Sequence, residues 1–408
     1  MDVKITPSAL SGIIAPPPSK SMAHRLIITA ALGSGVSTIG NVSFSQDIEA
    51  TLRCMEALGA RWEQTESGII RVHGIGKPTD AQEPLPHFDC GESGSTLRFL
   101  IPIALAVSGG GVFTGRGRLM ERPQKPYFDL FGEKGIFHQQ IDGVLTVRGK
   151  LTPGEYRLPG NVSSQFFTGL LLALSLLDAP STIVSTTVLE SADYIYMTID
   201  AMENAGVSVT VDHDRRIFHV TPAAYHSFDA TVEADWSQAG FWYAANFLDS
   251  QLEIQGLNPR SSQGDMVVSE LYWRLARPGD TEIDLSGCPD LLPPLAVMAA
   301  VRSGTTRFVN AARLRIKESD RLATVHQLLT ALGGSCEELP DGLTVQGAPS
   351  LSGGTVDGAN DHRIVMAAAI AATACQSPVT ILGAQAIQKS YPSFWEEYQR
   401  LGGNVHVL

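Results

Sequence analysis

The chain has 408 residues and a formal net charge of −12 at pH 7, with 44% hydrophobic and 18% charged residues. The acidic balance and the lack of a basic stripe argue against DNA or RNA as a partner, and no apolar run approaches the roughly 18 to 20 residues that a membrane-spanning helix needs. The length predicts two or three domains.

The cysteines indicate a reducing compartment. They are odd in number, widely scattered and without a C-x-x-C pair, at Cys54, Cys90, Cys288, Cys336 and Cys375. This pattern favours free thiols. The N-terminal stretch lacks a basic segment followed by an apolar core, so we expect no secretory signal and a cytoplasmic protein. No HExxH motif or His/Cys clustering predicts a metal site.

One unit recurs six times along the chain. Each copy has an apolar, alanine-rich helix, a small polar turn and a short β-branched strand, as in "LIITAALGSGVSTIGNV" and "LAVMAAVRSGTTRFVNA". The turns fall at Gly33, Ser108, Asp178, Asp249, Ser303 and Gln376. Subtracting neighbouring positions gives spacings of 75, 70, 71, 54 and 73 residues. Such a near-constant period predicts repeated supersecondary units.

A second helix follows the strand and tends to end in glycine. The first such helix is expected over 47–60, and later ones end at Gly206, Gly334 and Gly403. Glycine is favoured there because it adopts the left-handed conformation without steric cost. Short strands such as "IIRVHG" follow, so each unit is α/β with mixed strands. We expect the first helix of each unit to be buried and the second, with its charged face, to lie outside.

Six units of about 70 residues exceed one hydrophobic core. We therefore predict two domains of three units each, with a seam near "AAYHSFDATVEADWSQ". The alternative is a solenoid, although the units lack the short fixed consensus typical of such arrays.

Three of the expected buried helices begin with small polar residues, in "PPPSKSMAHR", "GESGSTLR" and "GNVSSQF". The exposed N–H groups and the dipole of a helix N-terminus attract anions. Lys20 and Arg25 lie near the first turn of the first helix, where a bound anion would offset their unfavourable position. The simpler interpretation is ordinary N-capping. No Walker A loop is present.

The second half carries charged motifs at the same place in the repeat. "RIKESDR" (315–321), "NDHR" (360–363), Lys389 and Asp290 all lie just before a helix. Each could be a surface salt bridge or a cap in isolation. If buried helices run parallel within each domain, however, their starts gather at one face. Two such faces opposed would form a cleft for a polyanionic small ligand.

Ten motifs in order give the chain a close resemblance to the 5-enolpyruvylshikimate-3-phosphate synthase family of enolpyruvyl transferases. They are "SKSMAHR", "SGSTLR", "MERP", "VSSQF", "ESADY", "ADWSQA", "CPDLLPP", "RIKESDR", "NDHRI" and "QKSYP". The resemblance implies two globules, each of three repeated α/β units with buried parallel helices and mixed sheets, joined by a double crossover. Residues 1–16 with 232–408 would form one globule, and residues 17–231 the other.

The family's reaction is what the resemblance implies for this chain. The 5-hydroxyl of shikimate 3-phosphate attacks C2 of phosphoenolpyruvate, a tetrahedral intermediate forms, and phosphate leaves. This step of the shikimate pathway, in aromatic amino acid biosynthesis, takes place in an interdomain cleft and needs no metal or organic cofactor. A monomer is the family expectation, and an open form is expected to close on its substrates.

The motifs assign residues to this chemistry. Asp290 and Glu318 are the expected acid–base carboxylates, helped by Lys20 as proton donor, with the order of proton transfers left open. The residues expected to bind shikimate 3-phosphate are Lys20, Ser21, Arg25, Ser163, Ser164, Gln165, Ser191, Tyr194, Asp290 and Lys317. Those expected to bind phosphoenolpyruvate are Lys20, Gly94, Arg122, Gln165, Arg321, His362, Arg363 and Lys389. Arginine suits such anions because it binds them bidentately.

Three residues, His24, Glu92 and Arg313, depart from the family pattern and are left out of the expected site. A Glu92 carboxylate that pointed inward would weaken anion binding.

Three other functions remain as alternatives. The nearest is the related transferase acting on UDP-N-acetylglucosamine, whose reactive cysteine is missing from "GRGRLMERP". The combined presence of Lys20, Asp290, Glu318 and Lys389 argues against a non-catalytic phosphate-binding repeat protein or an inactive paralogue. The net charge argues against a nucleic-acid-end-processing enzyme of related fold.

Overall fold

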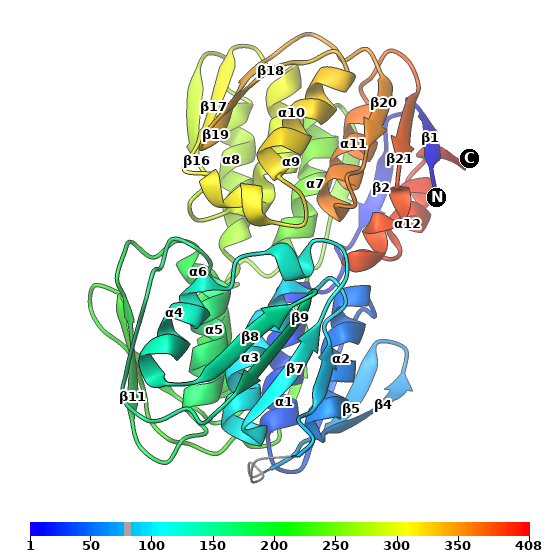
Figure 1. The fold of residues 1–408 in the computed structure, drawn as a ribbon. Coiled ribbons are helices and arrows are strands. Elements are labelled where there is room, and N and C mark those ends of the chain that lie inside the picture. The colour runs from blue at the N-terminus through cyan, green and yellow to red at the C-terminus, as the bar shows by residue number, and fades with distance from the viewer. Residues whose placement is uncertain (77–82) are drawn as a thin grey trace. The chain divides into compact units, whose positions relative to one another are not determined.

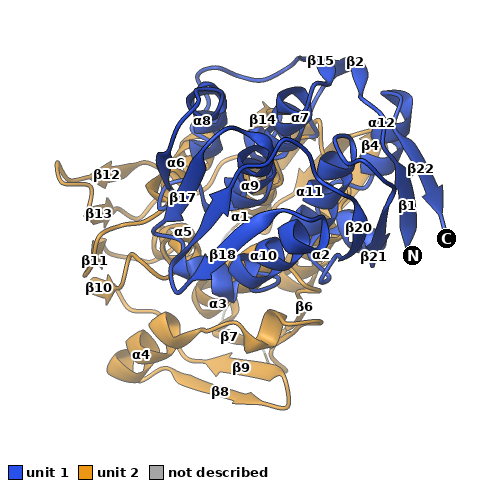
Figure 2. Ribbon diagram, turned by 90° about the horizontal axis from the view of Figure 1, so that it is seen from above, with its two compact units in different colours: residues 1–17, 234–408 blue, residues 18–233 orange. Residues whose placement is uncertain are grey.

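The structure, a computed structural model, describes residues 1–76 and 83–408. Contacts within the chain divide it into two compact units, which Figure 2 colours separately. Unit 1 consists of Met1–Pro17 and Ala234–Leu408, and unit 2 of Pro18–Glu233. The chain therefore leaves unit 1 after residue 17 and returns to it after residue 233. The sequence-based expectation put these passages after residues 16 and 231.

Unit 2 contains three copies of one strand–helix arrangement (Figure 1). Its buried helices are α1 (Lys20–Leu32), α3 (Gly94–Ser108) and α5 (Ser164–Leu174). Its other helices are α2 (Gln46–Leu58), α4 (Lys125–Lys134) and α6 (Ala192–Asn204), with η1 (Leu119–Glu121) before α4.

Each copy in unit 2 has a four-stranded sheet. The first contains β14 (Asp229–Thr231), β3 (Val36–Gly40), β5 (Ile69–His73) and β4 (Arg61–Glu66). The second contains β6 (His87–Asp89), β7 (Gly110–Thr114), β9 (Val144–Arg148) and β8 (Phe137–Ile141). The third contains β10 (Glu155–Leu158), β11 (Ser181–Ser185), β13 (Ile217–Val220) and β12 (Val209–Val211).

Unit 1 repeats the arrangement with one shortened copy. Its helices are α7 (Trp236–Phe247), η2 (Gly264–Val267), α8 (Val268–Leu275), η3 (Pro289–Leu291), α9 (Leu292–Val301), η4 (Ala312–Ile316), α10 (Arg321–Ala331), α11 (His362–Ala372), η5 (Ala384–Lys389) and α12 (Phe394–Arg400). One complete sheet contains β16 (Thr281–Asp284), β17 (Thr305–Val309), β19 (Gly342–Gln346) and β18 (Ser335–Leu339). The other complete sheet contains β20 (Gly354–Asp357), β21 (Val379–Leu382), β1 (Val3–Thr6) and β22 (Asn404–Val407). The shortened sheet has β15 (Gln251–Ile254) and β2 (Ser11–Ile14).

The four-stranded sheets all have the same internal order. A parallel pair comes first, as in β6 with β7, and an antiparallel pair completes the sheet, as in β9 with β8. Within the described residues, the sheet of β15 and β2 lacks that antiparallel pair, because the chain runs from α8 directly to β16. This missing hairpin accounts for the short spacing of 54 residues between Asp249 and Ser303.

The two strands at the unit boundaries are exchanged. In the other copies, the strand before a buried helix pairs in parallel with the strand after it, as β10 and β11 do around α5. By this rule β2 would pair with β3, and β14 with β15. Instead β14 pairs with β3, and β2 pairs with β15. The N-terminal segment thereby completes unit 1, and the end of the unit 2 segment completes unit 2.

Each unit has its own hydrophobic core. In α1 every residue from Met22 to Leu32 is buried, while α2 exposes Glu49, Arg53 and Glu56. The α/β fold class with mixed sheets and buried first helices is confirmed. The two separate hydrophobic cores argue against the solenoid alternative. A left-handed glycine follows the outer helices α2 and α6, at Gly59 and Gly206 with φ of 111° and 80°. After α10 and α12 the left-handed glycines are Gly333 and Gly402, each one residue before the expected Gly334 and Gly403. In the described part of the chain, no helix combines the length and apolar character that crossing a membrane requires.

Candidate active site

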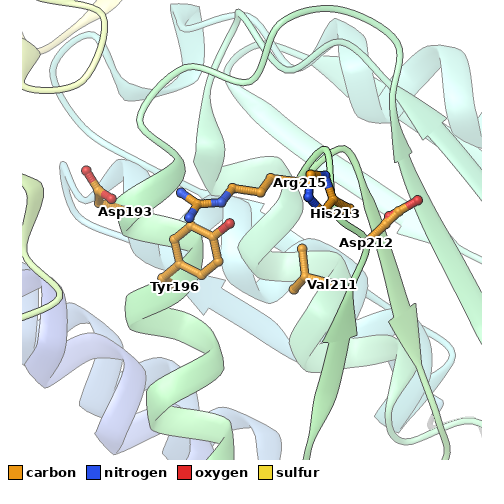
Figure 3. Close-up of a pocket in the computed structure, with 6 residues that line it drawn as sticks. All are labelled: Asp193, Tyr196, Val211, Asp212, His213 and Arg215. Carbon is orange, nitrogen blue, oxygen red and sulfur yellow. The ribbon is translucent and has the colours of Figure 1, made fainter.

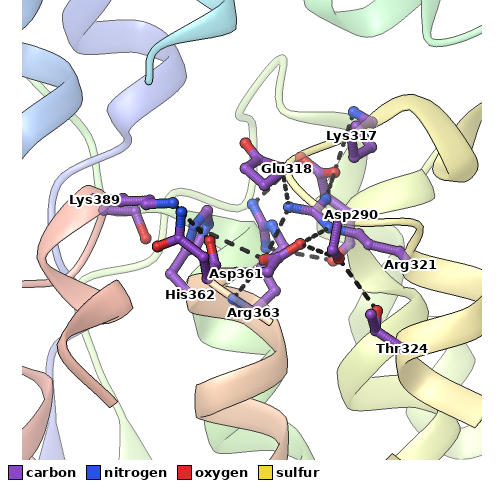
Figure 4. A network of polar contacts seen from close by, with 12 residues as sticks. Asp290, Lys317, Glu318, Arg321, Thr324, Asp361, His362, Arg363 and Lys389 are labelled. Atoms are coloured by element: carbon purple, nitrogen blue, oxygen red, sulfur yellow. Dashed lines mark hydrogen bonds and ion pairs between the residues drawn. The ribbon is translucent and has the colours of Figure 1, made fainter. Parts of the chain in front are cut away.

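In unit 1, Arg321 is the centre of a buried ionic cluster (Figure 4). It begins α10, which Asp320 caps by accepting from the Ala323 N–H, so Asp320 has the structural role of an N-cap. Arg321 donates from Nη1 to Asp290 at 2.7 Å and from Nη2 to Glu318 at 2.5 Å. Its Nε donates to Asp361 at 2.8 Å. Burial alone would lower the pKa of this guanidinium, but the three carboxylates outweigh burial and raise it.

Asp290, in η3 before α9, faces three cations. Besides Arg321, Lys317 Nζ lies 3.3 Å from its Oδ1 and Arg363 Nη2 lies 3.3 Å from its Oδ2. Burial would raise the pKa of this carboxyl, yet Arg363, Lys317 and Arg321 together hold it well below its usual value. Asp290 is therefore an ionised carboxylate at neutral pH, placed among groups that can bind an anion or exchange a proton.

Asp361 joins the starts of two helices. It caps α11 by accepting from the Arg363 N–H at 3.0 Å, and it accepts from Ser319 Oγ at 2.9 Å in addition to Arg321. His362 follows it and is also buried. At the end of η5, Lys389 Nζ donates to the Asn360 carbonyl at 2.6 Å. Lys389 and the "NDHR" segment are thus in direct contact.

Lys20 and Arg25 both lie in α1 of unit 2 but have different environments. Lys20 Nζ is 2.6 Å from Asp47 Oδ2 in the first turn of α2. Arg25 is buried and donates to the carbonyls of Ser21 at 2.6 Å and Tyr194 at 2.8 Å. Burial lowers the pKa of Arg25 to about 10, so it stays protonated at neutral pH.

The starts of α3 and α5 meet around Gln165. Its Oε1 accepts from Arg98 Nη1 at 2.8 Å, and its Nε2 donates to Ser95 Oγ at 3.0 Å. A Cβ on Gly94 would lie 2.7 Å from Arg122 Nη1 and 3.6 Å from Gln165 Oε1. The absence of a side chain at Gly94 therefore leaves room for the Arg122 guanidinium.

The serine motifs occupy helix starts. Ser163 caps α5 and Ser164 is its first helical residue. Ser191 precedes α6 with a φ of 51°, a left-handed conformation that costs a non-glycine residue energy and is concentrated at functional sites. Tyr194 lies in the first turn of α6, where its carbonyl binds Arg25.

The residues that depart from the family pattern are placed as follows. The Glu92 carboxylate lies against Gly117 in the turn before η1. Arg313 is buried and donates to the Ser286 carbonyl. His24 is buried inside unit 2 and contacts Thr51.

A surface pocket in unit 2 lies beside the expected residues of α6 without containing any of them. It has a volume of about 390 Å³ and is lined by Asp193, Tyr196, Val211, Asp212, His213 and Arg215 (Figure 3). The Arg215 guanidinium lies 5.6 Å from the centre of the Tyr196 ring and covers it. The pocket therefore adds no residue to the candidate site.

The motif residues thus form groups within each unit. In unit 1, Asp290, Lys317, Glu318, Arg321 and Arg363 share contacts. In unit 2, Ser21, Arg25 and Tyr194 form one group, and Gly94, Arg122 and Gln165 another, while Lys20 pairs with Asp47.

Sequence reasoning did not assign three residues that organise these groups: Asp47, Arg98 and Asp361. Asp47 lies in the first turn of α2, Asp361 is the N-cap of α11, and Arg98 is the fifth residue of α3. Their positions near a helix start and close to an assigned motif are the signal that could have found them.

Comparisons with known proteins match one family over nearly the whole chain. A family model described as EPSP synthase (3-phosphoshikimate 1-carboxyvinyltransferase) matches residues 5–398. Proteins named 3-phosphoshikimate 1-carboxyvinyltransferase from Clostridium novyi (strain NT) and Clostridium acetobutylicum are each 42% identical, over 99% of this chain and 98% of their own. An EPSP synthase structure from Acinetobacter baumannii superposes with a TM-score of 0.79 at 23% identity, covering 99% of both chains. That structural likeness concerns the fold.

Proposed function

Because the chain belongs to the EPSP synthase family, we propose that it is a 3-phosphoshikimate 1-carboxyvinyltransferase. It transfers the enolpyruvyl group of phosphoenolpyruvate to the 5-hydroxyl of shikimate 3-phosphate and releases phosphate, as a step of aromatic amino acid biosynthesis. The full-length match to relatives of this name supports the proposal.

The ionic cluster of unit 1 is the observation that carries the proposal. Addition of the hydroxyl must protonate C3 of phosphoenolpyruvate and remove the hydroxyl proton, and elimination must take a proton back from C3. Two carboxylates, Asp290 and Glu318, are held 2.7 and 2.5 Å from the same guanidinium of Arg321. We assign the proton transfers to this pair, with Lys20 as a further donor.

The cations of unit 1 are assigned to phosphoenolpyruvate. Arg321 already binds three carboxylates, so an anionic substrate would take over contacts that Asp290 and Glu318 now make. Release of these carboxylates as the substrate binds would free them for proton transfer. Arg363 and Lys389 are assigned to the same substrate with His362 in support, and their charge would stabilise the departing phosphate.

The helix starts of unit 2 are assigned to both substrates. Ser21, Arg25, Ser163, Ser164, Ser191 and Tyr194, with Lys317 of unit 1, are assigned to shikimate 3-phosphate. Gly94 and Arg122 are assigned to phosphoenolpyruvate. Gln165 is assigned to both substrates, because its N–H donates to Ser163 and its side chain lies beside Gly94. The proposal therefore assigns residues of both units to the reaction.

We also propose that the protein acts as a cytoplasmic monomer on these two small molecules, with no metal or organic cofactor. Size-exclusion chromatography with light scattering tests the monomer directly, and a mass of two chains would contradict it.

Phosphate release from phosphoenolpyruvate tests the function. The purified protein is assayed with shikimate 3-phosphate and with UDP-N-acetylglucosamine as separate acceptors, in buffer containing a metal chelator. We expect release with shikimate 3-phosphate only. Release with the nucleotide sugar alone would favour the related transferase, and release with neither from folded protein would refute the proposed activity.

A further inference from the structure

A chain of buried polar side chains crosses three helices of unit 2. His24 of α1 is fully buried, and its Nδ1 lies 2.7 Å from Thr51 Oγ1 of α2. Thr51 Oγ1 lies 2.7 Å from Thr96 Oγ1 of α3, which in turn donates to Ser93 Oγ at 2.7 Å. We call His24, Thr51, Thr96 and Ser93 the α1–α3 relay.

The donor and the acceptor of each hydrogen bond in the relay can be assigned. The single hydroxyl hydrogen of Thr96 goes to Ser93, so Thr51 must be the donor to Thr96. The single hydrogen of Thr51 is then used, so His24 must donate to Thr51 from Nδ1–H. This requires the neutral Nδ1–H tautomer, and burial, with Lys20 and Arg25 nearby, holds the pKa of His24 well below its usual value. Among the described residues, His24 Nε2 has no hydrogen-bond partner.

The relay ends at the N-cap residue of α3. Ser93 is the N-cap of this helix and accepts from the Thr96 N–H at 3.2 Å. Because both bonds from Thr96 use acceptor positions of Ser93 Oγ, the Ser93 hydroxyl hydrogen is the last donor of the relay. The next residue is Gly94, whose surroundings include Arg122 and Gln165. The relay thus ends one residue before Gly94.

We propose that His24 is a positioning residue for phosphoenolpyruvate: its Nδ1–H, acting through Thr51 and Thr96, fixes Ser93 and the start of α3 beside Arg122. This deepens the proposed function and rests on it. His24 touches no substrate in this proposal. His24, which departs from the family pattern, then donates a hydrogen bond that helps to position α3 and does not bring a charge to the candidate site.

The test compares variants that keep or remove the Nδ1 donor. His24→Leu removes it, whereas His24→Asn places an amide N–H at the position of Nδ1 and keeps it. We expect His24→Leu to raise the KM for phosphoenolpyruvate about fivefold to tenfold, the effect of losing roughly one hydrogen bond. The KM for shikimate 3-phosphate and kcat should change less than twofold, and His24→Asn should restore the KM to within twofold.

Further variants distinguish an effect of the relay on KM from a general effect of altered core packing. Thr51→Val breaks the next link and should reproduce the effect of His24→Leu, and the double variant should be no worse than either single one. Thr29→Val is the matched control: this threonine is also buried in α1, but its hydroxyl donates to the Arg25 and Leu26 carbonyls of the same helix. It should leave both KM values unchanged. Equal rises in both KM values, additive effects, or failure of His24→Asn to rescue would overturn the proposal.

A spectroscopic test stands apart from activity. In ¹⁵N-histidine-labelled protein, the His24 signals, identified by their loss in His24→Asn, should show a protonated Nδ1 and an unprotonated Nε2. A protonated Nε2 would refute the relay whether or not the enzyme is active. A wild-type protein without transferase activity but with the Nδ1–H tautomer would refute the proposed function and leave the relay geometry in place.

Discussion

At the scale of single residues, the ionisation of Asp290 is decided by competition between burial and charge. Burial of an unpaired carboxylate would favour its neutral form, whereas three cations within 3.3 Å favour the charged one. The cations prevail, so the folded pKa lies well below the unfolded value of about 3.9. Asp290 therefore stabilises the folded state above about pH 4, and this contribution is lost as the pH falls through the folded pKa.

Asp290→Asn should accordingly be most destabilising at neutral pH. We expect a loss of about 3 kcal/mol in the free energy of unfolding at pH 7, because three buried or half-buried cations lose their shared partner. The difference from wild type should shrink as the pH falls towards 3. Denaturant unfolding at pH 7, 5 and 3 measures it.

A surface pair provides the control for this experiment. Asp129→Asn removes an exposed partner of Lys125 in α4 and should cost less than about 0.5 kcal/mol. A difference between wild type and Asp290→Asn that stayed constant down to pH 3 would mean that the Asp290 carboxylate is not held ionised by its neighbours.

Much of the residue-scale picture could be predicted from the sequence, because motifs such as "RIKESDR" combine unusual charge with a fixed place before a helix. Partners such as Asp361 and Asp47 could not, because a carboxylate in the first turn of a helix has the same pattern whether it caps, pairs on the surface or binds a buried arginine. Only the tertiary contacts distinguish these cases.

At the scale of elements, the packing of α5 against α3 is close because of one glycine. A Cβ on Gly169 would lie 2.5 Å from the Arg98 carbonyl and 2.9 Å from Pro102 Cγ, both in α3. Neither a backbone carbonyl nor a proline ring within a helix can move aside. Since these two helices carry Gly94 and Gln165 at their starts, their separation also sets the geometry of the candidate site.

Gly169→Ala should therefore force α5 away from α3. We expect a loss of about 1–3 kcal/mol in the free energy of unfolding, although alanine is the better helix former. Gly132→Ala is the matched control, because a Cβ added to Gly132 in α4 would meet nothing within 4 Å, and this variant should be stabilised by up to about 1 kcal/mol. Equal stability changes for the two variants, measured by denaturant unfolding, would contradict the close approach.

The repeated elements were readable from their period, but their pairing was not. The 54-residue spacing departs from the other four, yet it could not show that the antiparallel hairpin after α8 is missing from this copy. The pattern of short strands did not show the exchange of β2 and β14 either, since such strands do not encode which of two similar parallel partners they join. Only the family resemblance, with its double crossover, implied that residues 1–16 belong with 232–408.

At the scale of the whole molecule, unit 2 is built from one segment of the chain and unit 1 from two. Unit 2 is one continuous segment, 18–233, and all strands of its sheets lie within it. Unit 1 needs the N-terminal segment, because β1 is an inner strand between β21 and β22, with Val3 opposite both Ile381 and Val407. Without β1, β22 would lose its ladder partner and β21 would keep only β20.

Separate fragments should reflect this difference. We expect residues 18–233 to fold alone with a cooperative thermal transition in circular dichroism. Residues 234–408 should gain such a transition only when a peptide of residues 1–17 is added. The same peptide with Val3→Asp and Ile5→Asp is the control and should have no effect, because both side chains are buried in the unit 1 core. Cooperative folding of 234–408 without any peptide would show that β1 is dispensable.

The inner position of β1 also has a consequence for synthesis. Unit 2 is complete once residue 233 has emerged from the ribosome, whereas β1, which is made before unit 2, pairs with a strand that ends at Val407. The 175 residues from 234 to 408 (408 minus 233) take roughly 9 to 35 s to translate at 5 to 20 residues per second. During that interval the nascent chain carries a finished unit 2 between two unfinished parts of unit 1. We therefore expect chaperone contact and premature termination to affect mainly the unit that contains Asp290 and Arg321.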